Sequence, residues 1–242
     1  MHKKRSTENQ GPLIALVGCD GSGKSTLSFD LAEALNQGRP AKCCYLGQGS
    51  GNIGRKISQF RFGGKILGRI IDKKAGTART KGKKIPGVLT ALVIFFFSCV
   101  RFLNFKKMLK LRKQGVLIIA DRYPQTDVVG FYDGPGLSAA HTQNRFIQFL
   151  VKTEYRLYDY MASIKPDLII RLNIDVDTAY QRKQDHDYNL LKIKVEATQK
   201  LKFRGAPIVD IDASLPYKEV YETAMRAIRK VEIAYSKGKI RN

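Results

Sequence analysis

The stretch Gly18–Ser25 reads GCDGSGKS and fits the pattern G-x-x-x-x-G-K-[ST] without a mismatch. It follows an apolar run at 13–18 (LIALVG), which is typical of a strand buried on both faces, and it precedes leucines at helical spacing over 26–35. Glycines let successive backbone N–H groups of such a loop point at phosphate oxygens, and the N-terminal end of the following helix attracts the same anion. The stretch therefore predicts a strand, a phosphate-binding loop and a helix, in that order.

The residue types in this loop also predict a nucleoside triphosphate as the ligand. The Lys24 ammonium can bridge the β- and γ-phosphates, and the Ser25 hydroxyl can hold Mg²⁺. A fortuitous glycine turn is a weak alternative, because the pattern arises by chance in a chain of this length on the order of 1% of the time. We expect ATP and Mg²⁺ to be bound by Gly18, Cys19, Asp20, Gly21, Ser22, Gly23, Lys24, Ser25 and Thr26.

Further along the chain, short apolar runs alternate with helical patterns. The runs that predict strands are 41–46, 116–120, 167–173 and 207–211, and the helical patterns occupy 85–113, 142–163, 176–183 and 218–235. This alternation predicts an α/β fold of the P-loop NTPase type, in which helices cover both faces of a five-stranded parallel sheet. We expect one such domain over 12–242, with its ligands at the carboxyl ends of the strands.

The charge of the chain is large and unevenly spread. Its 242 residues carry 43 Lys+Arg against 21 Asp+Glu, a formal net charge of +22. Between Arg55 and Lys113 there are 17 Lys/Arg and a single acid, Asp72. Such a patch attracts nucleic acid, an acidic membrane surface or a phosphorylated metabolite. No nucleic-acid-binding module is recognisable, so we favour an anionic membrane surface as the partner of 55–113.

Two segments lack a hydrophobic pattern. Residues 1–11 are expected to form a disordered basic arm, and the basic, glycine-rich stretch 55–84 a loop, an insertion or a mobile segment. The start of the chain has no apolar segment of the kind a signal peptide needs. The longest apolar run, 88–100, has 13 residues, short of the roughly 20 that span a bilayer.

The four cysteines form no CxxC pair and are typical of reduced thiols in a cytoplasmic protein. We expect a cytoplasmic protein that meets the inner face of the membrane. Cys19 lies in the phosphate-binding loop, but no cation beyond Lys24 flanks it to lower its pKa. Whether Cys19 is sensitive to oxidation is left open.

Three further features follow predicted strands. Asp121 and Arg122 end the third strand, where a carboxylate can reach the Mg²⁺ water shell or position an acceptor oxygen, and an arginine can grip an acceptor phosphate. Arg182 and Lys183 precede a polar stretch, and we expect a lid near 182–194 that brings positive charge to the transferring phosphoryl group. The segment 211–214 (IDAS) follows the fifth strand and is placed to touch the base of a nucleotide.

Together these segments resemble the thymidylate kinase family of nucleoside monophosphate kinases. The resemblance covers most of the chain except 1–11 and 55–84, and its pieces occur in the family's order. They are GCDGSGKST (18–26), Arg101, ADRYP (120–124), PDLIIRLNIDVDTAYQRK (166–183) and IVDIDAS (208–214).

The resemblance implies an ATP-dependent phosphotransferase, with dTMP as the first acceptor to consider. It implies that Asp20 contacts the sugar hydroxyl of the acceptor, and that Arg101 and Arg122 hold its phosphate with Tyr123 beside them. Lys24, Asp121 and Arg182 would be the catalytic residues, with Ser25 and Asp121 holding Mg²⁺. Ala213 and Ser214 would line the adenine site.

The acceptor half of the site departs from the family pattern. Thymidylate kinases usually carry Arg-Glu-Pro after the second strand, whereas 46–51 here reads LGQGSG. The combination of DRYP (121–124), DGPGL (133–137) and Glu154 is similar to thymidylate-kinase-like proteins of bacterial surface polysaccharide synthesis. The alternative is therefore a membrane-peripheral kinase or ATP switch acting on a sugar or lipid-linked acceptor.

Three smaller interpretations depend on helix geometry. Phe95–Phe97 is apolar all round and predicts either a subunit interface or a lipid contact. The interface fits the dimers usual in the thymidylate kinase family, so we expect a homodimer. Glu154 and its neighbours at helical spacing either pack between helices, which we favour, or face the acceptor. Asp177 is expected to cap the helix that follows the fourth strand.

Overall fold

The computed structural model describes residues 10–47, 87–130, 133–139, 142–184 and 186–238. They fall into two compact units. The first contains the described residues up to Leu46, then Phe105–Tyr123 and the residues from Lys165 onward; the second contains those in Gly47–Asn104 and Pro124–Ile164. Most of the predicted basic arm and all of the basic stretch 55–84 lie outside the described residues. The single domain over 12–242 stays a prediction.

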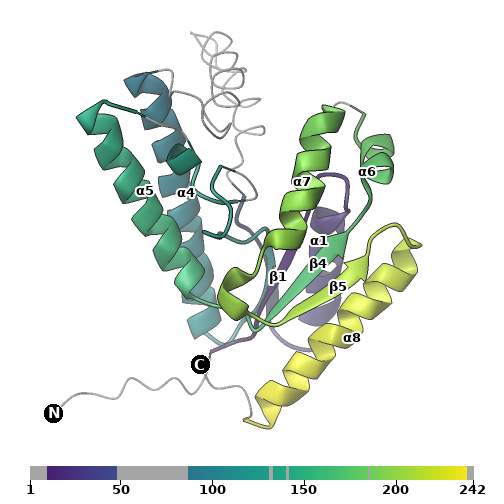
Figure 1. Ribbon diagram of the computed structural model, residues 1–242. Coiled ribbons are helices and arrows are strands. Elements are labelled where there is room, and N and C mark those ends of the chain that lie inside the picture. The colour runs from purple at the N-terminus through teal and green to yellow at the C-terminus, as the bar shows by residue number, and fades with distance from the viewer. Residues whose placement is uncertain (1–9, 48–86, 131–132, 140–141, 185, 239–242) are drawn as a thin grey trace, which may run out of the picture. The chain divides into compact units, whose positions relative to one another are not determined.

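The first unit is built on a five-stranded parallel sheet with the order β2-β3-β1-β4-β5, which confirms the predicted α/β fold. Figure 1 labels β1, β4 and β5 of this sheet. All six residues of the central strand β1 are buried, as its continuous apolar run requires. Leu16 of β1 pairs with Asp121 of β3, so the carboxyl end of β3 lies beside the end of β1. The strands are β1 (Leu13–Gly18), β2 (Ala41–Tyr45), β3 (Leu117–Asp121), β4 (Leu168–Asn173) and β5 (Ile208–Asp212).

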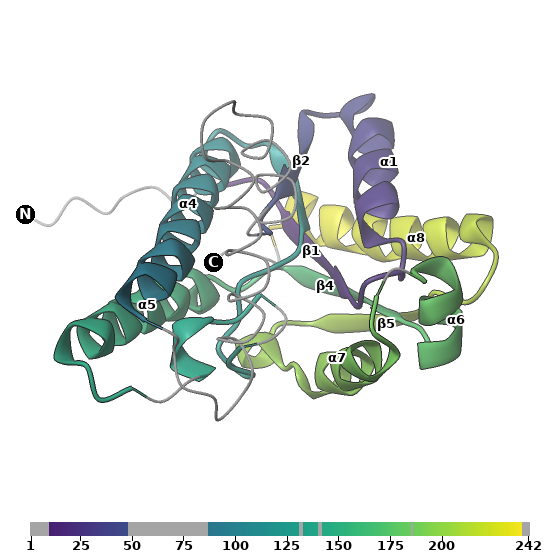
Figure 2. The ribbon, with the colours of Figure 1, turned by 90° about the horizontal axis from the view of Figure 1, so that it is seen from above.

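Helices cover both faces of this sheet. On one face α1 (Lys24–Asn36) packs on β2 and β3, α8 (Tyr217–Ser236) packs on β4 and β5, and the two helices contact each other. On the other face α7 (Tyr188–Lys200) contacts β1 (Figure 2). The first unit therefore has the three layers of a P-loop NTPase-like fold.

The connection after β4 contains two helices, where the sequence predicted one. The predicted helix is α6 (Val176–Arg182), and α7 follows it. The predicted cap at Asp177 is wrong, because Asp177 already lies in the first turn of α6. Asp175 is the cap: its backbone is extended (φ −72°, ψ 163°), and its carboxylate accepts the Thr178 N–H at 2.8 Å.

The second unit is built around two helices. α4 (Val88–Lys113) begins in this unit and ends in the first, and α5 (Arg145–Ser163) lies wholly within the second unit. The Asn144 side chain caps α5 by accepting its first backbone N–H groups. The apolar core of the unit joins α4, α5 and the short 3-10 helix Leu137–Ala139, and consists of Ala91, Ile94, Leu137, Ile147 and Leu150.

A fully buried carboxylate, Glu154, ties α5 to α4 and to the 3-10 helix. It accepts the Ser98 hydroxyl at 2.6 Å, the Leu137 N–H at 2.7 Å and the Gly136 N–H at 3.2 Å. Three donors on one buried carboxylate offset much of the cost of removing its charge from water. This geometry favours the packing interpretation of Glu154.

Within the described residues, α4 is the one helix whose length and composition would allow it to cross a membrane. It has 26 residues, and its most apolar window has a mean hydropathy of 2.1 with 33% of that window buried. The 13-residue run at 88–100 had predicted a segment too short to span. Core helices of soluble proteins can be equally long and apolar.

Candidate active site

The loop between β1 and α1 has a backbone that requires glycine at two positions. Gly21 has a φ of 88° and Gly23 a φ of 80°, in the left-handed region that side chains rarely adopt. A Cβ atom on Gly21 would lie 2.9 Å from the carbonyl oxygen of Ala179, so this loop passes close against α6. Gly23 is also the N-cap of α1 and offers no side-chain acceptor to the helix. The start of α1 is thus built to present its N–H groups to an anion.

Ser25 and Asp121 meet at the end of this loop. The Ser25 hydroxyl donates to Asp121 Oδ2 at 2.7 Å. Asp121 is buried, and its other oxygen, Oδ1, has no hydrogen-bond partner among the described residues. A buried carboxylate oxygen of this kind is costly unless it has a ligand. A serine hydroxyl beside a carboxylate is the oxygen pair with which P-loop proteins hold Mg²⁺, so these two residues fit the ion.

Lys24 is folded back onto the loop. Its ammonium donates to the Cys19 carbonyl at 2.9 Å and lies 3.8 Å from Asp20 Oδ1, and the side chain is nearly buried. No phosphate is needed to hold it in this position. These contacts hold its positive charge against the backbone of the loop.

Asp20 lies beside basic side chains from three other segments of the first unit. Arg122 Nη2 lies 3.2 Å from its Oδ1, His186 Nε2 lies 3.8 Å from its Oδ2, and Lys194 of α7 donates to Oδ2. Burial alone would raise the pKa of Asp20, but Lys194 and Lys24 outweigh it and hold this pKa well below its usual range. The Asp20 carboxylate is therefore ionised and is shared by Lys24, Arg122 and Lys194.

Lys194 is a site residue that the sequence interpretation missed. Its helix, α7, begins after the Asp187 cap, whose carboxylate accepts the Leu190 N–H at 2.8 Å. The buried residues Leu191 and Thr198 lie three before and four after Lys194, so Lys194 is on the inward face of α7. The sequence signal for Lys194 is a lysine on the apolar face of a helix. This signal can be used only after α7 has been recognised as a helix.

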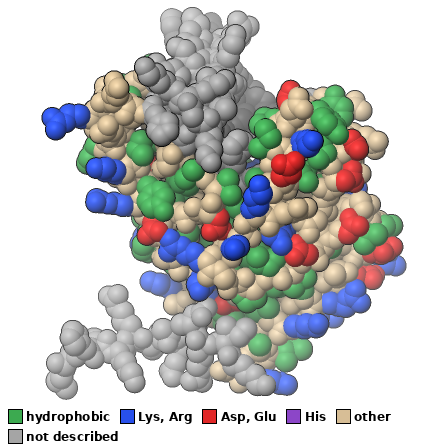
Figure 3. Space-filling view, viewed as in Figure 1, with side chains coloured by type: hydrophobic (Ala, Val, Ile, Leu, Met, Phe, Trp, Pro, Cys, Tyr) green, Lys and Arg blue, Asp and Glu red, His purple; other side chains and the backbone are tan. Residues whose placement is uncertain are grey.

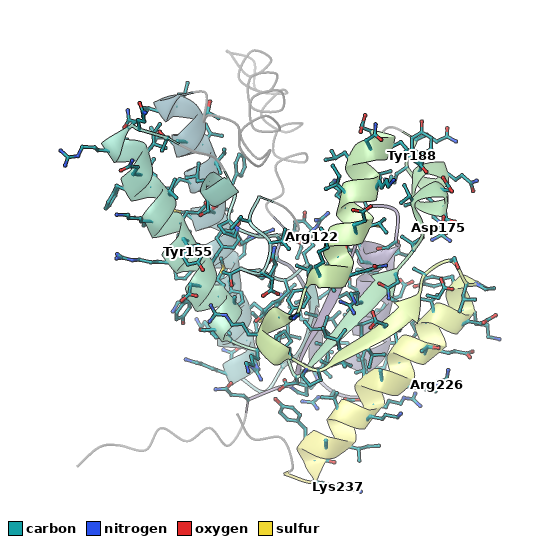
Figure 4. All side chains as sticks on the ribbon, in the orientation of Figure 1. Arg122, Tyr155, Asp175, Tyr188, Arg226 and Lys237 are labelled. Atoms are coloured by element: carbon teal, nitrogen blue, oxygen red, sulfur yellow. The ribbon has the colours of Figure 1, made fainter. Side chains whose placement is uncertain are left out.

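Two predicted residues after β3 have different surroundings. Arg122, labelled in Figure 4, has a φ of 71°, which is rare for a residue with a side chain. Its guanidinium donates to Asp20 Oδ1 at 3.2 Å. Tyr123 is buried, and its ring packs edge-on against Phe105 with 5.9 Å between centroids. Burial raises the pKa of the Tyr123 phenol far above its usual value. Arg122 is thus beside the loop, whereas Tyr123 lies in the core.

Arg182 and the segment after β5 come together. Arg182 Nη1 donates to the Ala213 carbonyl oxygen at 2.9 Å. The Asp212 carboxylate accepts the Ser214 backbone N–H at 2.8 Å and its hydroxyl at 2.6 Å, which fixes the turn. In the conformation described, Arg182 is therefore on the side of the site that we predicted for adenine.

Arg101 belongs to the second unit. Its guanidinium pairs with the Asp133 carboxylate, donates to the Asp133 carbonyl at 2.8 Å and reaches the Tyr158 hydroxyl at 3.2 Å. These contacts hold the loop that contains Asp133 to α4 and α5. The predicted acceptor-phosphate role of Arg101 stays a prediction.

The loop cysteine is shielded. Cys19 is almost fully buried, and this burial raises the pKa of its thiol to about 11, with Lys24 opposing the shift. At neutral pH the thiol is therefore protonated and weakly nucleophilic.

In the described part of the chain, no three His, Cys, Asp or Glu residues cluster to hold a metal by themselves. This is compatible with an Mg²⁺ ion that takes most of its oxygens from phosphates and water.

Comparisons with known proteins add two close relatives. No protein-family model matches the chain. The chain is 46% identical over 217 residues to the "Uncharacterized ATP-binding protein YghS" of Escherichia coli (strain K12), which covers 89% of this chain and 92% of that protein. It is 41% identical over 222 residues to the "Uncharacterized ATP-binding protein YghR" of the same strain, which covers 91% of this chain and 88% of that protein.

Proposed function

This chain belongs to the same family as YghS and YghR, and from that premise we propose that it binds ATP at the loop 18–25 and transfers the γ-phosphoryl group to an acceptor. Both relatives are named ATP-binding proteins. A P-loop NTPase-like fold is compatible with many activities, so the argument for transfer rests on the side chains at the loop.

The observation that carries the proposal is the pair formed by Ser25 and Asp121. A 2.7 Å hydrogen bond joins them, and the second oxygen of the buried Asp121 carboxylate lacks a hydrogen-bond partner among the described residues. When bound there, Mg²⁺ supplies positive charge to the β- and γ-phosphates and fixes their orientation. Ser25 and Asp121 would hold the ion, and α1 would present its first N–H groups to the phosphates.

The remaining chemistry is charge neutralisation by residues of the same unit. Phosphoryl transfer asks for positioning and for cations around the moving group, with little covalent chemistry from the protein. Lys24, Arg122 and Lys194 already converge on the Asp20 carboxylate. An incoming phosphate carries more negative charge than Asp20 and draws the same cations. In this proposal Lys24 and Lys194 stabilise the transferring group, and Arg182 closes on the nucleotide.

The proposal extends to the chemical class of the acceptor. We propose a nucleoside monophosphate, with dTMP first, because DRY (121–123) and IDAS (211–214) resemble thymidylate kinase segments. The proposal is supported by the 3.2 Å hydrogen bond from Arg122 Nη2 to Asp20 Oδ1, since both residues are expected to contact the acceptor. A sugar or lipid-linked acceptor is the second candidate, since the family's Arg-Glu-Pro motif is absent from 46–51.

The test measures ADP release from MgATP in the presence of candidate acceptors: dTMP, other nucleoside monophosphates, sugar phosphates and lipid-linked sugars. Thermal shift with a non-hydrolysable ATP analogue measures nucleotide binding separately. Lys24→Ala should lower kcat by about 10²-fold or more, while Lys218→Ala, an exposed lysine on α8, should match the wild type.

The possible results of this test separate ATP binding, phosphoryl transfer and the choice of acceptor. Binding of the analogue without turnover on any acceptor would overturn phosphoryl transfer and leave ATP binding standing. Absence of any analogue-induced shift, with Mg²⁺ present, would overturn the nucleotide site itself. Turnover on dTMP alone among the nucleotides would support the thymidylate kinase type.

A further inference from the structure

One face of α4 carries exposed large hydrophobic side chains in a single row. Leu89, Leu92, Phe96 and Leu103 are separated by three, four and seven residues, so they lie above one another on one stripe of the helix. All four are exposed, with Leu89 at 64% and Phe96 at 60%. The row is about 21 Å long at the rise of an α-helix. Exposed apolar rows of this size mark an interaction surface.

The opposite face of α4 is committed to the fold. Ala91 and Ile94 belong to the core shared with α5, and the Ser98 hydroxyl donates to the buried Glu154 carboxylate at 2.6 Å. Arg101, on the same inward face, pairs with Asp133. A helix that crossed a bilayer would have to give up these contacts. Only the outward stripe is therefore available, and α4 can lie on a surface rather than pass through it.

The stripe changes from apolar to basic along the helix. Lys107 and Lys110 follow Leu103 at spacings of four and three residues, so they continue the same row, and both are exposed. The sequence of α4 contains no Asp or Glu. On α5 the outward residues Arg145, Phe149, Lys152 and Arg156 also combine basic and aromatic side chains. Figure 3 shows Lys and Arg side chains along the edge of the molecule over α5.

We propose that this stripe, Leu89 to Lys110 of α4, docks on the surface of an anionic phospholipid bilayer. Its leucines and phenylalanine would enter the headgroup–acyl boundary, and its lysines would meet the phosphates. The charge decides against a second copy of the chain as the occupant. Two copies would bring three exposed lysines each, at 107, 110 and 113, against one another, and the sequence of α4 contains no acid. This inference does not depend on the proposed phosphotransfer.

The experiment is flotation of the full chain with vesicles of phosphatidylcholine alone and of phosphatidylcholine mixed with phosphatidylglycerol. We expect the protein to float with the mixed vesicles at low salt and not with the neutral ones. Phe96→Ser should weaken partitioning by about tenfold or more. Its matched control is Phe29→Ser on α1, because Phe29 is also 60% exposed and lies outside the stripe.

A second pair of variants tests the contribution of the lysines of the stripe to membrane binding. Each basic side chain at an anionic surface is worth about a fivefold change in partitioning, so Lys107→Glu with Lys110→Glu should lower it by about 30-fold or more. Lys218→Glu with Lys230→Glu, two exposed lysines of α8, should lower it far less. Circular dichroism and ATP-analogue binding should match the wild type in all variants.

Three outcomes would overturn the proposal. The first is a wild type that stays in the bottom fraction with mixed vesicles at low salt. The second is flotation of the stripe variants as complete as that of their matched controls. The third is a stable dimer in sedimentation that Phe96→Ser dissociates, which would make the stripe a subunit interface.

Discussion

Glu154→Ala should destabilise the protein severely, because this carboxylate is fully buried and accepts three hydrogen bonds. Its donors are the Ser98 hydroxyl at 2.6 Å and the backbone N–H groups of Leu137 at 2.7 Å and Gly136 at 3.2 Å. Removing the acceptor leaves buried donors unpaired at about 1–3 kcal/mol each, and opens a cavity. We expect a loss of about 3–5 kcal/mol in the free energy of unfolding, against a typical total of about 5–15 kcal/mol.

Chemical denaturation followed by circular dichroism measures this loss. Glu154→Gln should lower the free energy of unfolding by less, about 2 kcal/mol, because the amide keeps one oxygen acceptor. The remaining loss arises because the amide NH2 group is a donor where a second acceptor is needed. Lys152→Ala, on the exposed side of the same helix, should change stability by about 0.5 kcal/mol or less. A loss below about 1 kcal/mol for Glu154→Ala, joined to a raised KM for the acceptor, would refute the packing role and favour contact with substrate.

Three further predictions concern the first unit. Lys194→Ala should weaken ATP-dependent turnover by about tenfold or more, while Lys192→Ala on the exposed side of α7 should not, as steady-state kinetics would show. Asp175→Ala removes the cap of α6 and should cost about 1 kcal/mol of unfolding free energy in denaturant titrations; an unchanged midpoint would contradict the cap. Because the pKa of Cys19 is raised to about 11, iodoacetamide should alkylate it about 100-fold more slowly at pH 8 than an ordinary cysteine, with a rate that climbs as the pH approaches that value. Mass spectrometry of the labelled peptide follows this rate, and fast labelling at neutral pH would contradict the burial.

The parts of the structure that the sequence could predict are those that depend on neighbouring residues. The run LIALVG (13–18) followed by a glycine-rich loop predicts β1 and α1, because apolar continuity and glycine spacing are local properties. The helix α7 was missed for a related reason. It starts in the polar stretch 184–189 (QDHDYN), and its inward face is interrupted by Lys194, so the hydrophobic period was broken where the site needs a charge.

Other features depend on contacts between distant segments, which no local pattern contains. DRY (121–123) suggested that Tyr123 lies beside Arg122 at the acceptor, yet adjacent residues of a chain leaving a strand point in different directions. The Arg122 guanidinium reaches Asp20, and the Tyr123 ring packs on Phe105. The N-cap residue of α6 could not be predicted from the local pattern either. Asp175 and Asp177 both suit a cap, and only the point where the backbone turns helical separates them.

The ion-pair cluster at Asp20 carries the last prediction. In the described conformation Asp20 is the anion that Lys24, Arg122 and Lys194 share. Asp20→Asn keeps the shape of the side chain and removes the negative charge that these three cations share. The nucleotide-free variant should lose about 1–3 kcal/mol of stability. The pKa of Asp20 is depressed, so the wild-type contribution is present above the ordinary aspartate pKa of about 4 and is lost as the pH falls further.

The same substitution should affect the liganded protein in the opposite direction. Phosphate or an ATP analogue would restore the missing negative charge, so it should raise the melting temperature of Asp20→Asn by more than it raises that of the wild type. A thermal-shift titration with inorganic phosphate, then with the analogue, measures the difference. If Asp20 instead contacts the sugar of the acceptor, Asn should leave both ligand-induced shifts unchanged and raise only the KM for the acceptor. A smaller shift in the variant than in the wild type would contradict the view that Asp20 holds the place of a phosphate, because a neutral side chain cannot compete with the ligand for these cations.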